Sequence, residues 1–136
     1  MCSRIKKMKN IVLYIVLLAL TSCKTQQVAI TSIEWKLVQL NSEDVASVDP
    51  PLTLLLNETQ MKISGFAGCN RFFGSYQLGE SNLQFSGLGS TKMYCQDKSA
   101  TEDKYLKALN EVQSFKIEGD KLVLLAGEKT ILEFKK

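Results

Sequence analysis

Two short stretches, residues 65–76 and 88–95, hold most of the side chains that could do chemistry. They supply two thiols, an amide, a guanidinium, a hydroxyl and an amine: Cys69, Cys95, Asn70, Arg71, Thr91 and Lys92. A guanidinium can hold a carboxylate or a lipid phosphate through two parallel hydrogen bonds. Thr91 and Lys92 line the same site as Arg71 if the two cysteines are bonded, because the bridge places both stretches side by side. We therefore take Asn70, Arg71, Thr91 and Lys92 as the candidate binding residues.

Structural roles explain the same residues without a ligand. Asn70 is typical of a turn residue at positive φ, or of one that hydrogen-bonds its own backbone. Arg71 can form an internal ion pair or lie along the rings of Phe72 and Phe73. The three glycines and four aromatic residues of 65–76 predict a tight, partly buried corner between two strands. A purely structural contact between the two stretches would explain their polar residues as well as a binding site does.

The composition excludes several kinds of active site. The chain has no histidine, which removes Ser-His and Cys-His nucleophile pairs and histidine metal sites. Its cysteines and carboxylates show no metal-ligand spacing. The segment Gly65-x-x-Gly68 lacks the Lys-Ser/Thr ending and the following helix of a phosphate-binding loop. We assign no catalytic residue, no metal site and no cofactor.

The N-terminal end has the order of a secretory signal peptide. A basic cluster at residues 4–9 precedes an apolar run at residues 11–20 and the small residues before Cys23. The run is too short to span a bilayer, which needs about 20 residues; the alternative is a short anchor that stays on the protein. The ending Leu20-Thr21-Ser22-Cys23 resembles a bacterial lipobox. This resemblance implies that residues 1–22 are removed and that Cys23 becomes a lipidated N-terminus, with fatty acyl chains such as palmitate.

The positive charge of the chain belongs to the export signal. Removal of residues 1–22 removes four basic residues and no acidic one, which changes the net charge from +3 to −1. No basic patch for nucleic acid remains. The expected partners are the membrane, through the lipid on Cys23, and an envelope protein or lipid. Lys24 in place of Asp favours the periplasmic face of the outer membrane, if the host sorts lipoproteins as enterobacteria do. We expect a monomer.

Two cysteines remain in the mature domain once Cys2 leaves with the signal and Cys23 is lipidated. Cys69 and Cys95 are an even pair in an oxidising compartment. We interpret them as a structural disulfide, with two buried thiols as the alternative. Their spacing matches neither a CxxC redox motif nor a metal site.

The elements that must position these residues are short strands and one helix. Alternation in residues 33–37 predicts a strand with Trp35 as a core anchor, although a single tryptophan can also be a stacking platform for a ligand. Closely spaced turns predict antiparallel hairpins. In the helix that follows residue 98, Ser99 and Glu102 form a capping box, and Tyr105 begins the apolar face.

These elements predict a mainly β (α+β) domain with seven or eight short strands. The sheet is expected to be a curled antiparallel sheet or a partly open barrel, with one helix packed on it. We expect a signal peptide at residues 1–22, a lipidated tether at residues 23–32 and one domain at residues 33–136.

The mature region resembles the META/HslJ domain family in several motifs and in their order. The matching residues are Trp35, the run Ser64-Gly65-x-x-Gly68-Cys69-Asn70-Arg71-Phe72-x-Gly74-x-Tyr76, Leu83-x-Phe85, Ser90-Thr91-Lys92-Met93-x-Cys95, the helix with Glu102 and residues 105–109, and the closing hairpins to Phe134. The resemblance implies an antiparallel β domain with a packed helix and supports the Cys69–Cys95 bridge. It also implies a secreted protein or lipoprotein of the bacterial envelope, linked to stress or drug tolerance, without established enzymatic activity.

Three hypotheses for function follow. The first is a non-enzymatic envelope lipoprotein that binds a protein or lipid partner, or supports the envelope under stress. The second is an enzyme that uses Arg71, Thr91 and Lys92, which needs a lysine or carboxylate base because histidine is absent. The third is a thiol redox sensor built on Cys69 and Cys95.

Overall fold

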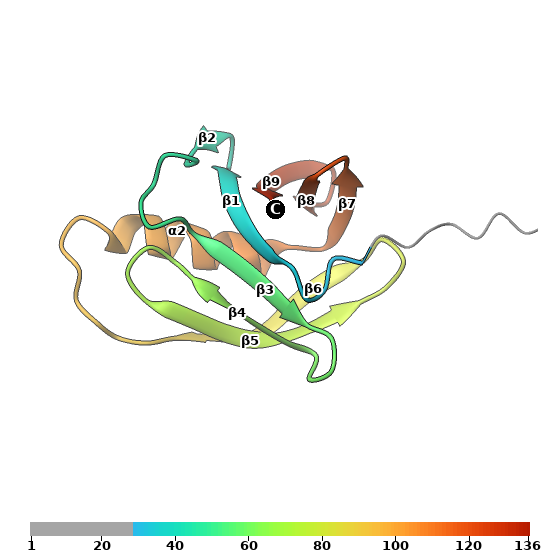
Figure 1. Cartoon of the computed structure of the whole chain (residues 1–136), viewed down its shortest axis with the longest axis horizontal. Helices are drawn as coiled ribbons and strands as arrows, with labels where there is room; N and C mark the ends of the chain where they lie inside the picture. Colours follow the sequence, from blue (N-terminus) through green and yellow to red (C-terminus); the bar gives the residue numbers. More distant parts are fainter. Residues whose placement is uncertain (1–28) are drawn as a thin grey trace, which may run out of the picture.

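Alternating apolar residues form the inner face of one strongly curved antiparallel sheet (Figure 1). The computed structural model describes residues 29–136. The strands are β1 (Glu34–Leu40), β2 (Glu43–Asp44), β3 (Thr53–Asn57), β4 (Lys62–Phe66), β5 (Arg71–Leu78), β6 (Leu83–Ser90), β7 (Ser114–Glu118), β8 (Lys121–Ala126) and β9 (Lys129–Lys135), and the helix is α2 (Ser99–Glu111). The signal peptide and the lipidation site predicted at residues 1–23 lie outside the described residues.

The sheet is nearly, but not fully, closed. Its strands follow the order β6-β5-β4-β3-β1-β9-β8-β7, and the short β2 pairs with β1. The two edge strands meet at one point, where Phe115 N–H donates to the Ser81 carbonyl at 2.9 Å and Leu83 N–H donates to the Gln113 carbonyl at 3.2 Å. Helix α2 connects these edges and packs against β6 and β1. The predicted fold class, a mainly β curled sheet with one packed helix, is confirmed.

Aromatic side chains fill the space between the sheet and the helix. The rings of Phe72 and Tyr105 meet edge to face with centroids 5.6 Å apart, and Tyr105 also contacts the ring of Phe134 at 6.4 Å. Trp35 is completely buried, and its Nε1–H donates to the Ile30 carbonyl at 2.9 Å, as expected for a core anchor. Ile30 is itself buried, so the packed part of the domain includes a residue that the sequence placed in the tether.

Helix α2 has the predicted apolar face but not the predicted cap. Tyr105, Leu109 and Val112 are buried against the sheet. The helix begins at Ser99 after Lys98, and no side chain of residues 29–136 caps its N-terminus. The prediction of a capping box was therefore wrong, because the Glu102 carboxylate accepts hydrogen bonds from Asn70 instead. A buried donor that would otherwise lack a partner favours this long-range pairing over a local cap.

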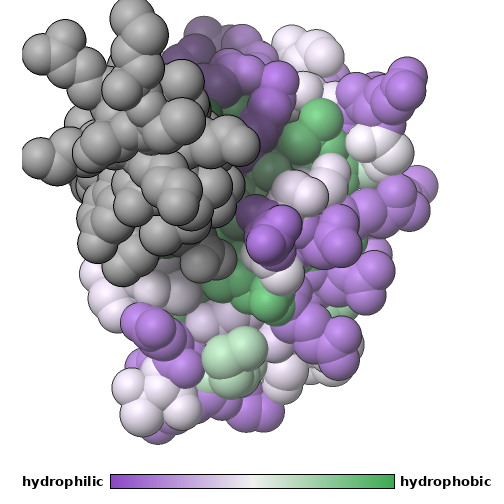
Figure 2. Space-filling model, turned by 90° about the vertical axis from the view of Figure 1, so that its right-hand side faces the viewer, coloured by the Kyte–Doolittle hydropathy of each residue, from purple (hydrophilic) through white to green (hydrophobic). Residues whose placement is uncertain are grey.

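Strand β4 separates two ends of the molecule that matter for function. At one end, Ser32 N–H donates to the Leu56 carbonyl at 2.8 Å, which holds the start of the described chain beside the β3–β4 turn. At the other end lies the corner at residues 67–70, between β4 and β5. Figure 1 shows the chain entering on the right and this corner on the left. The entry end carries mainly hydrophilic side chains around a smaller hydrophobic area (Figure 2). Across residues 29–136, α2 is neither long nor apolar enough to cross a membrane.

Candidate functional site

Two glycines allow the chain to form the corner. Gly68 has φ of +106°, which side chains rarely tolerate, and Ala67 N–H donates to the Asn70 carbonyl at 2.9 Å to close the turn. Gly65 lies so close to β3 that a Cβ there would collide with the Thr53 carbonyl oxygen and come within 2.6 Å of the Phe72 ring. The corner therefore packs tightly against the sheet, as its glycine content predicted.

A disulfide ties the corner to the loop at residues 91–98, which we call the bridge loop. Cys69 and Cys95 are bonded, with their Cα atoms 5.8 Å apart and 26 positions between them in sequence. The predicted disulfide is confirmed. The bridge joins the corner between β4 and β5 to the segment that leads into α2, so the two chemistry-bearing stretches lie side by side.

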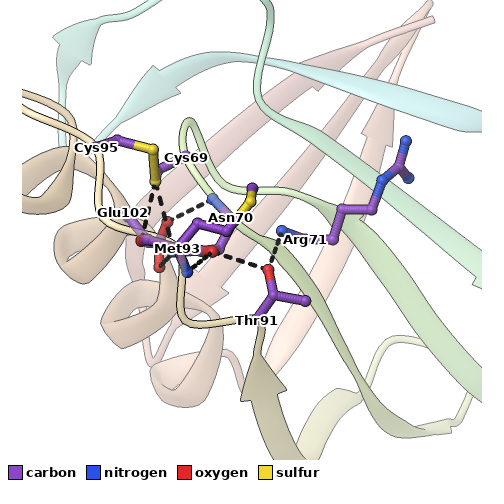
Figure 3. Close-up of a disulfide and its surroundings, with 7 residues drawn as sticks. All are labelled: Cys69, Asn70, Arg71, Thr91, Met93, Cys95 and Glu102. Carbon is purple, nitrogen blue, oxygen red and sulfur yellow. Dashed lines mark hydrogen bonds between the residues drawn. A yellow bond between two sulfur atoms is a disulfide. The ribbon is translucent and has the colours of Figure 1, made fainter.

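Asn70 is the centre of the hydrogen bonds around the disulfide (Figure 3). Its side-chain oxygen accepts from the Thr91 hydroxyl and from Met93 N–H, both at 2.8 Å. Its side-chain amide donates to the Met93 carbonyl at 3.2 Å and to Glu102 at 3.1 Å. An asparagine amide has two donors and two acceptor sites, so these four bonds use its full capacity. Asn70 is buried and its φ is not positive.

Glu102 completes the cluster from the helix side. One carboxylate oxygen accepts from the Asn70 backbone N–H at 2.8 Å, and the other accepts from the Asn70 side chain. Burial of a carboxylate is costly unless hydrogen bonds compensate for its lost hydration. These two bonds supply that compensation and fix the first turn of α2 to the corner.

The four candidate binding residues separate into two kinds. Asn70 and Thr91 direct their polar groups into the cluster, and the Thr91 oxygen also accepts from Arg71 N–H at 3.3 Å. Arg71 and Lys92 are exposed. Figure 3 shows the Arg71 side chain pointing away from the disulfide. Within residues 29–136, Arg71 forms no ion pair and no cation–π contact, so neither structural role expected for its side chain is present.

Three exposed apolar residues beside the cluster were missed by the sequence analysis. Phe73, Met93 and Tyr94 expose 56%, 64% and 90% of their surface. The Phe73 ring lies against Gly89, where an added Cβ would come within 2.9 Å of it. Strand alternation carried the signal for Phe73, because Phe72 faces the core and its neighbour must face outward. No local signal marks Met93 or Tyr94.

The polar groups of the cluster hydrogen-bond to one another, which is a structural role. The Thr91 hydroxyl donates its proton to the Asn70 amide oxygen, which is too weak a base to activate it as a nucleophile. Burial raises the pKa of Tyr105 well above its ordinary value, and its hydroxyl donates to the Thr53 carbonyl at 3.0 Å. In the part of the chain that the structure describes, no three His, Cys, Asp or Glu side chains are grouped as metal ligands.

A protein-family model matches the sequence of this domain. The model of the META domain matches residues 28–136. This chain belongs to the META domain family. The META domain covers all the strands and the helix described above, and its family is not a known enzyme family. No curated protein matches the chain.

Three solved structures resemble this META domain. An NMR structure of a protein from Burkholderia xenovorans is 30% identical, with a TM-score of 0.63, and the match covers 77% of this chain and 81% of that one. A second NMR structure is 28% identical, with a TM-score of 0.59 and coverage of 75% and 86%. A crystal structure of a DUF4847 family protein from Bacteroides vulgatus is 16% identical, with a TM-score of 0.50 and coverage of 62% and 57%, and shows a similar fold only.

Proposed function

We propose that this META-domain protein is a non-enzymatic binding module of the bacterial envelope, anchored through a lipid on Cys23. The signal-like order of residues 1–22 and the lipobox-like ending at Cys23 support export and lipidation. Two acyl signals give stable membrane attachment, whereas one chain binds only marginally. The proposed location is the periplasmic face of the outer membrane, and the proposed role is to bind an envelope partner, with support of the envelope under stress as its consequence.

One observation carries the binding role: the polar groups at the corner hold the bridge loop, and the side chains around it remain in solvent. Asn70 and the disulfide fix this loop directly, and Glu102 holds Asn70 in place. The loop nevertheless exposes Met93 and Tyr94. Exposed apolar side chains on a fixed loop are typical of an interaction surface, because little conformational entropy is lost on binding.

Crosslinking in intact cells of the lipidated protein tests this proposal. We expect a discrete adduct that disappears in Arg71→Ala, because Arg71 is an exposed cation of the proposed surface. Lys129→Ala is the matched control, since Lys129 is an exposed cation at the start of β9, away from β5 in the strand order. A binding module keeps its adduct in this control. The absence of any specific adduct with the unaltered protein would contradict the binding role.

A further inference from the structure

Five exposed side chains lie on β5 and the bridge loop toward the corner end of the domain, and we call them the distal patch: Arg71, Phe73, Lys92, Met93 and Tyr94. Phe73 lies over Gly89, and the next outward residue of β5 toward the corner is Arg71. Arg71 pairs with the start of the bridge loop, since Thr91 N–H donates to the Arg71 carbonyl at 3.0 Å. The three remaining members follow Thr91 directly in sequence. The patch therefore spans the start of β5 and the bridge loop that is hydrogen-bonded to it.

The patch combines apolar area with positive charge. Phe73, Met93 and Tyr94 supply apolar surface, and tyrosine and arginine are enriched at the energetic centres of protein interfaces. Arg71 and Lys92 supply two cations, and no carboxylate of residues 29–136 pairs with either. The bridge loop contains Lys92 and Lys98 against the single acid Asp97. A complementary partner therefore presents carboxylates next to apolar side chains.

The bridge-loop part of the patch lies toward the end of β4 opposite the point where the chain enters the fold. Cys23 and Ala29 are joined by six peptide units, which span at most about 21 Å. The chain enters the fold beside the β3–β4 turn, where Thr31 Oγ1 donates to Glu58 at 3.3 Å. Strand β4 leads from this turn to the corner and adds about 16 Å for its five residues. The chain therefore enters the fold at the turn end of β4, and the bridge loop, which carries most of the patch, lies toward the other end (Figure 1).

We propose that the distal patch docks an acidic, partly apolar segment of another envelope protein, on the side of the domain that faces away from the membrane. This inference rests on the proposed function and names the partner class for the same surface. The carboxylates of the segment pair with Arg71 and Lys92, and its apolar side chains pack on Phe73, Met93 and Tyr94. The fixed loop presents these groups in one arrangement, which limits the entropy cost of docking.

Photo-crosslinking from two positions tests the inference in cells that produce the full lipidated chain. A photoreactive amino acid replaces Tyr94 in one sample and Met61 in the other. Met61 is the matched control, because it is an exposed apolar residue on the β3–β4 turn at the opposite end of β4. We expect a protein adduct from position 94 and none of the same mass from position 61. Mass spectrometry of the adduct should place the crosslink within a peptide that carries Asp or Glu beside apolar residues.

Binding of a synthetic copy of that crosslinked peptide then tests whether charge pairing contributes to docking. Its Kd for the purified protein should rise about tenfold or more in Arg71→Glu, because like charges across an interface are strongly unfavourable. Lys129→Glu should leave the Kd unchanged, since Lys129 is an exposed cation at the start of β9, away from β5 in the strand order. Added salt should weaken binding to the unaltered protein. A crosslink from position 94 to lipid, or to a peptide without acidic residues, overturns this inference and leaves a binding module in place. The absence of any adduct from position 94 overturns both proposals.

Discussion

Asn70 and Glu102 lie 32 positions apart in sequence, and the Asn70 backbone and side-chain N–H groups both donate to the Glu102 carboxylate, at 2.8 Å and 3.1 Å. The same asparagine accepts two hydrogen bonds from the bridge loop. One amide thus joins the corner, the bridge loop and the first turn of α2. A buried group with this many partners specifies one arrangement of all three segments.

Replacement of Asn70 tests this role in stability. We expect Asn70→Ala to lower the free energy of unfolding by about 3 kcal/mol, because Glu102 then stays buried with one donor fewer and the bridge loop loses three hydrogen bonds. Asn110→Ala is the matched control, since Asn110 is exposed and donates only to the Leu106 carbonyl of its own helix. This control should change stability by less than about 0.5 kcal/mol. Equal losses for the two variants in urea denaturation would contradict a central role for Asn70.

The pairing of Asn70 with Glu102 could not be predicted from the sequence. The pattern Ser99-x-x-Glu102 is a good local signature for a capping box, and it competes with a partner that only the folded sheet brings near. Features that depend on short-range sequence patterns could be predicted. The apolar face of α2, the core position of Trp35 and the glycine-rich corner all follow from local periodicity or backbone freedom, and the structure has each of them. The exposure of Met93 and Tyr94 depends on where the disulfide holds their loop, so it could not be predicted from a local sequence pattern.

The Cys69–Cys95 bridge should contribute stability through the unfolded state. We expect the double variant Cys69→Ser, Cys95→Ser to lose about 2–4 kcal/mol, because the bridge restricts a loop of the unfolded chain. The measurement is chemical denaturation of both proteins without reductant. A thiol count gives an independent check: the denatured, unreduced mature protein should show no alkylatable thiol from either position. Two free thiols there, or equal stability of the two proteins, would contradict a structural bridge.

Gly65 should not tolerate a side chain. A methyl group there would meet the Thr53 carbonyl oxygen and the Phe72 ring, so we expect Gly65→Ala to lower the free energy of unfolding by about 3 kcal/mol or to prevent folding. Gly79→Ala is the control, because its nearest neighbour would be 3.6 Å away and its φ is not positive. Thermal unfolding should show a large loss of Tm for the first variant and little change for the second.

Tyr105 should make the domain less stable in strongly alkaline solution. Burial raises the pKa of Tyr105 well above the usual value of about 10. The folded state therefore keeps a proton that the unfolded state loses, so its stabilising effect is complete below pH 10 and declines as the pH rises above that value. One such group changes the free energy of unfolding by up to about 1.4 kcal/mol per pH unit.

The variant Tyr105→Phe isolates this effect. It should cost about 1 kcal/mol at pH 7, because the hydrogen bond to the Thr53 carbonyl is lost. Between pH 10 and pH 12 its stability should then fall less steeply than that of the unaltered protein. Some slope should remain, since burial and the charge of Glu58 also raise the pKa of Tyr76. Parallel pH profiles for the two proteins would contradict a buried, protonated Tyr105.

The lipid anchor on Cys23 and the distal patch are proposed to lie at opposite ends of the domain. Fluorescence energy transfer from the protein to an acceptor lipid in the vesicle surface measures this directly, with a fluorescent amino acid at position 94 or at position 61 of the lipidated protein. The account predicts less efficient transfer from position 94 than from position 61, because β4 separates the bridge-loop end from the turn at which the chain enters. Transfer from position 94 that equals or exceeds that from position 61 would place the patch at the membrane and contradict the account.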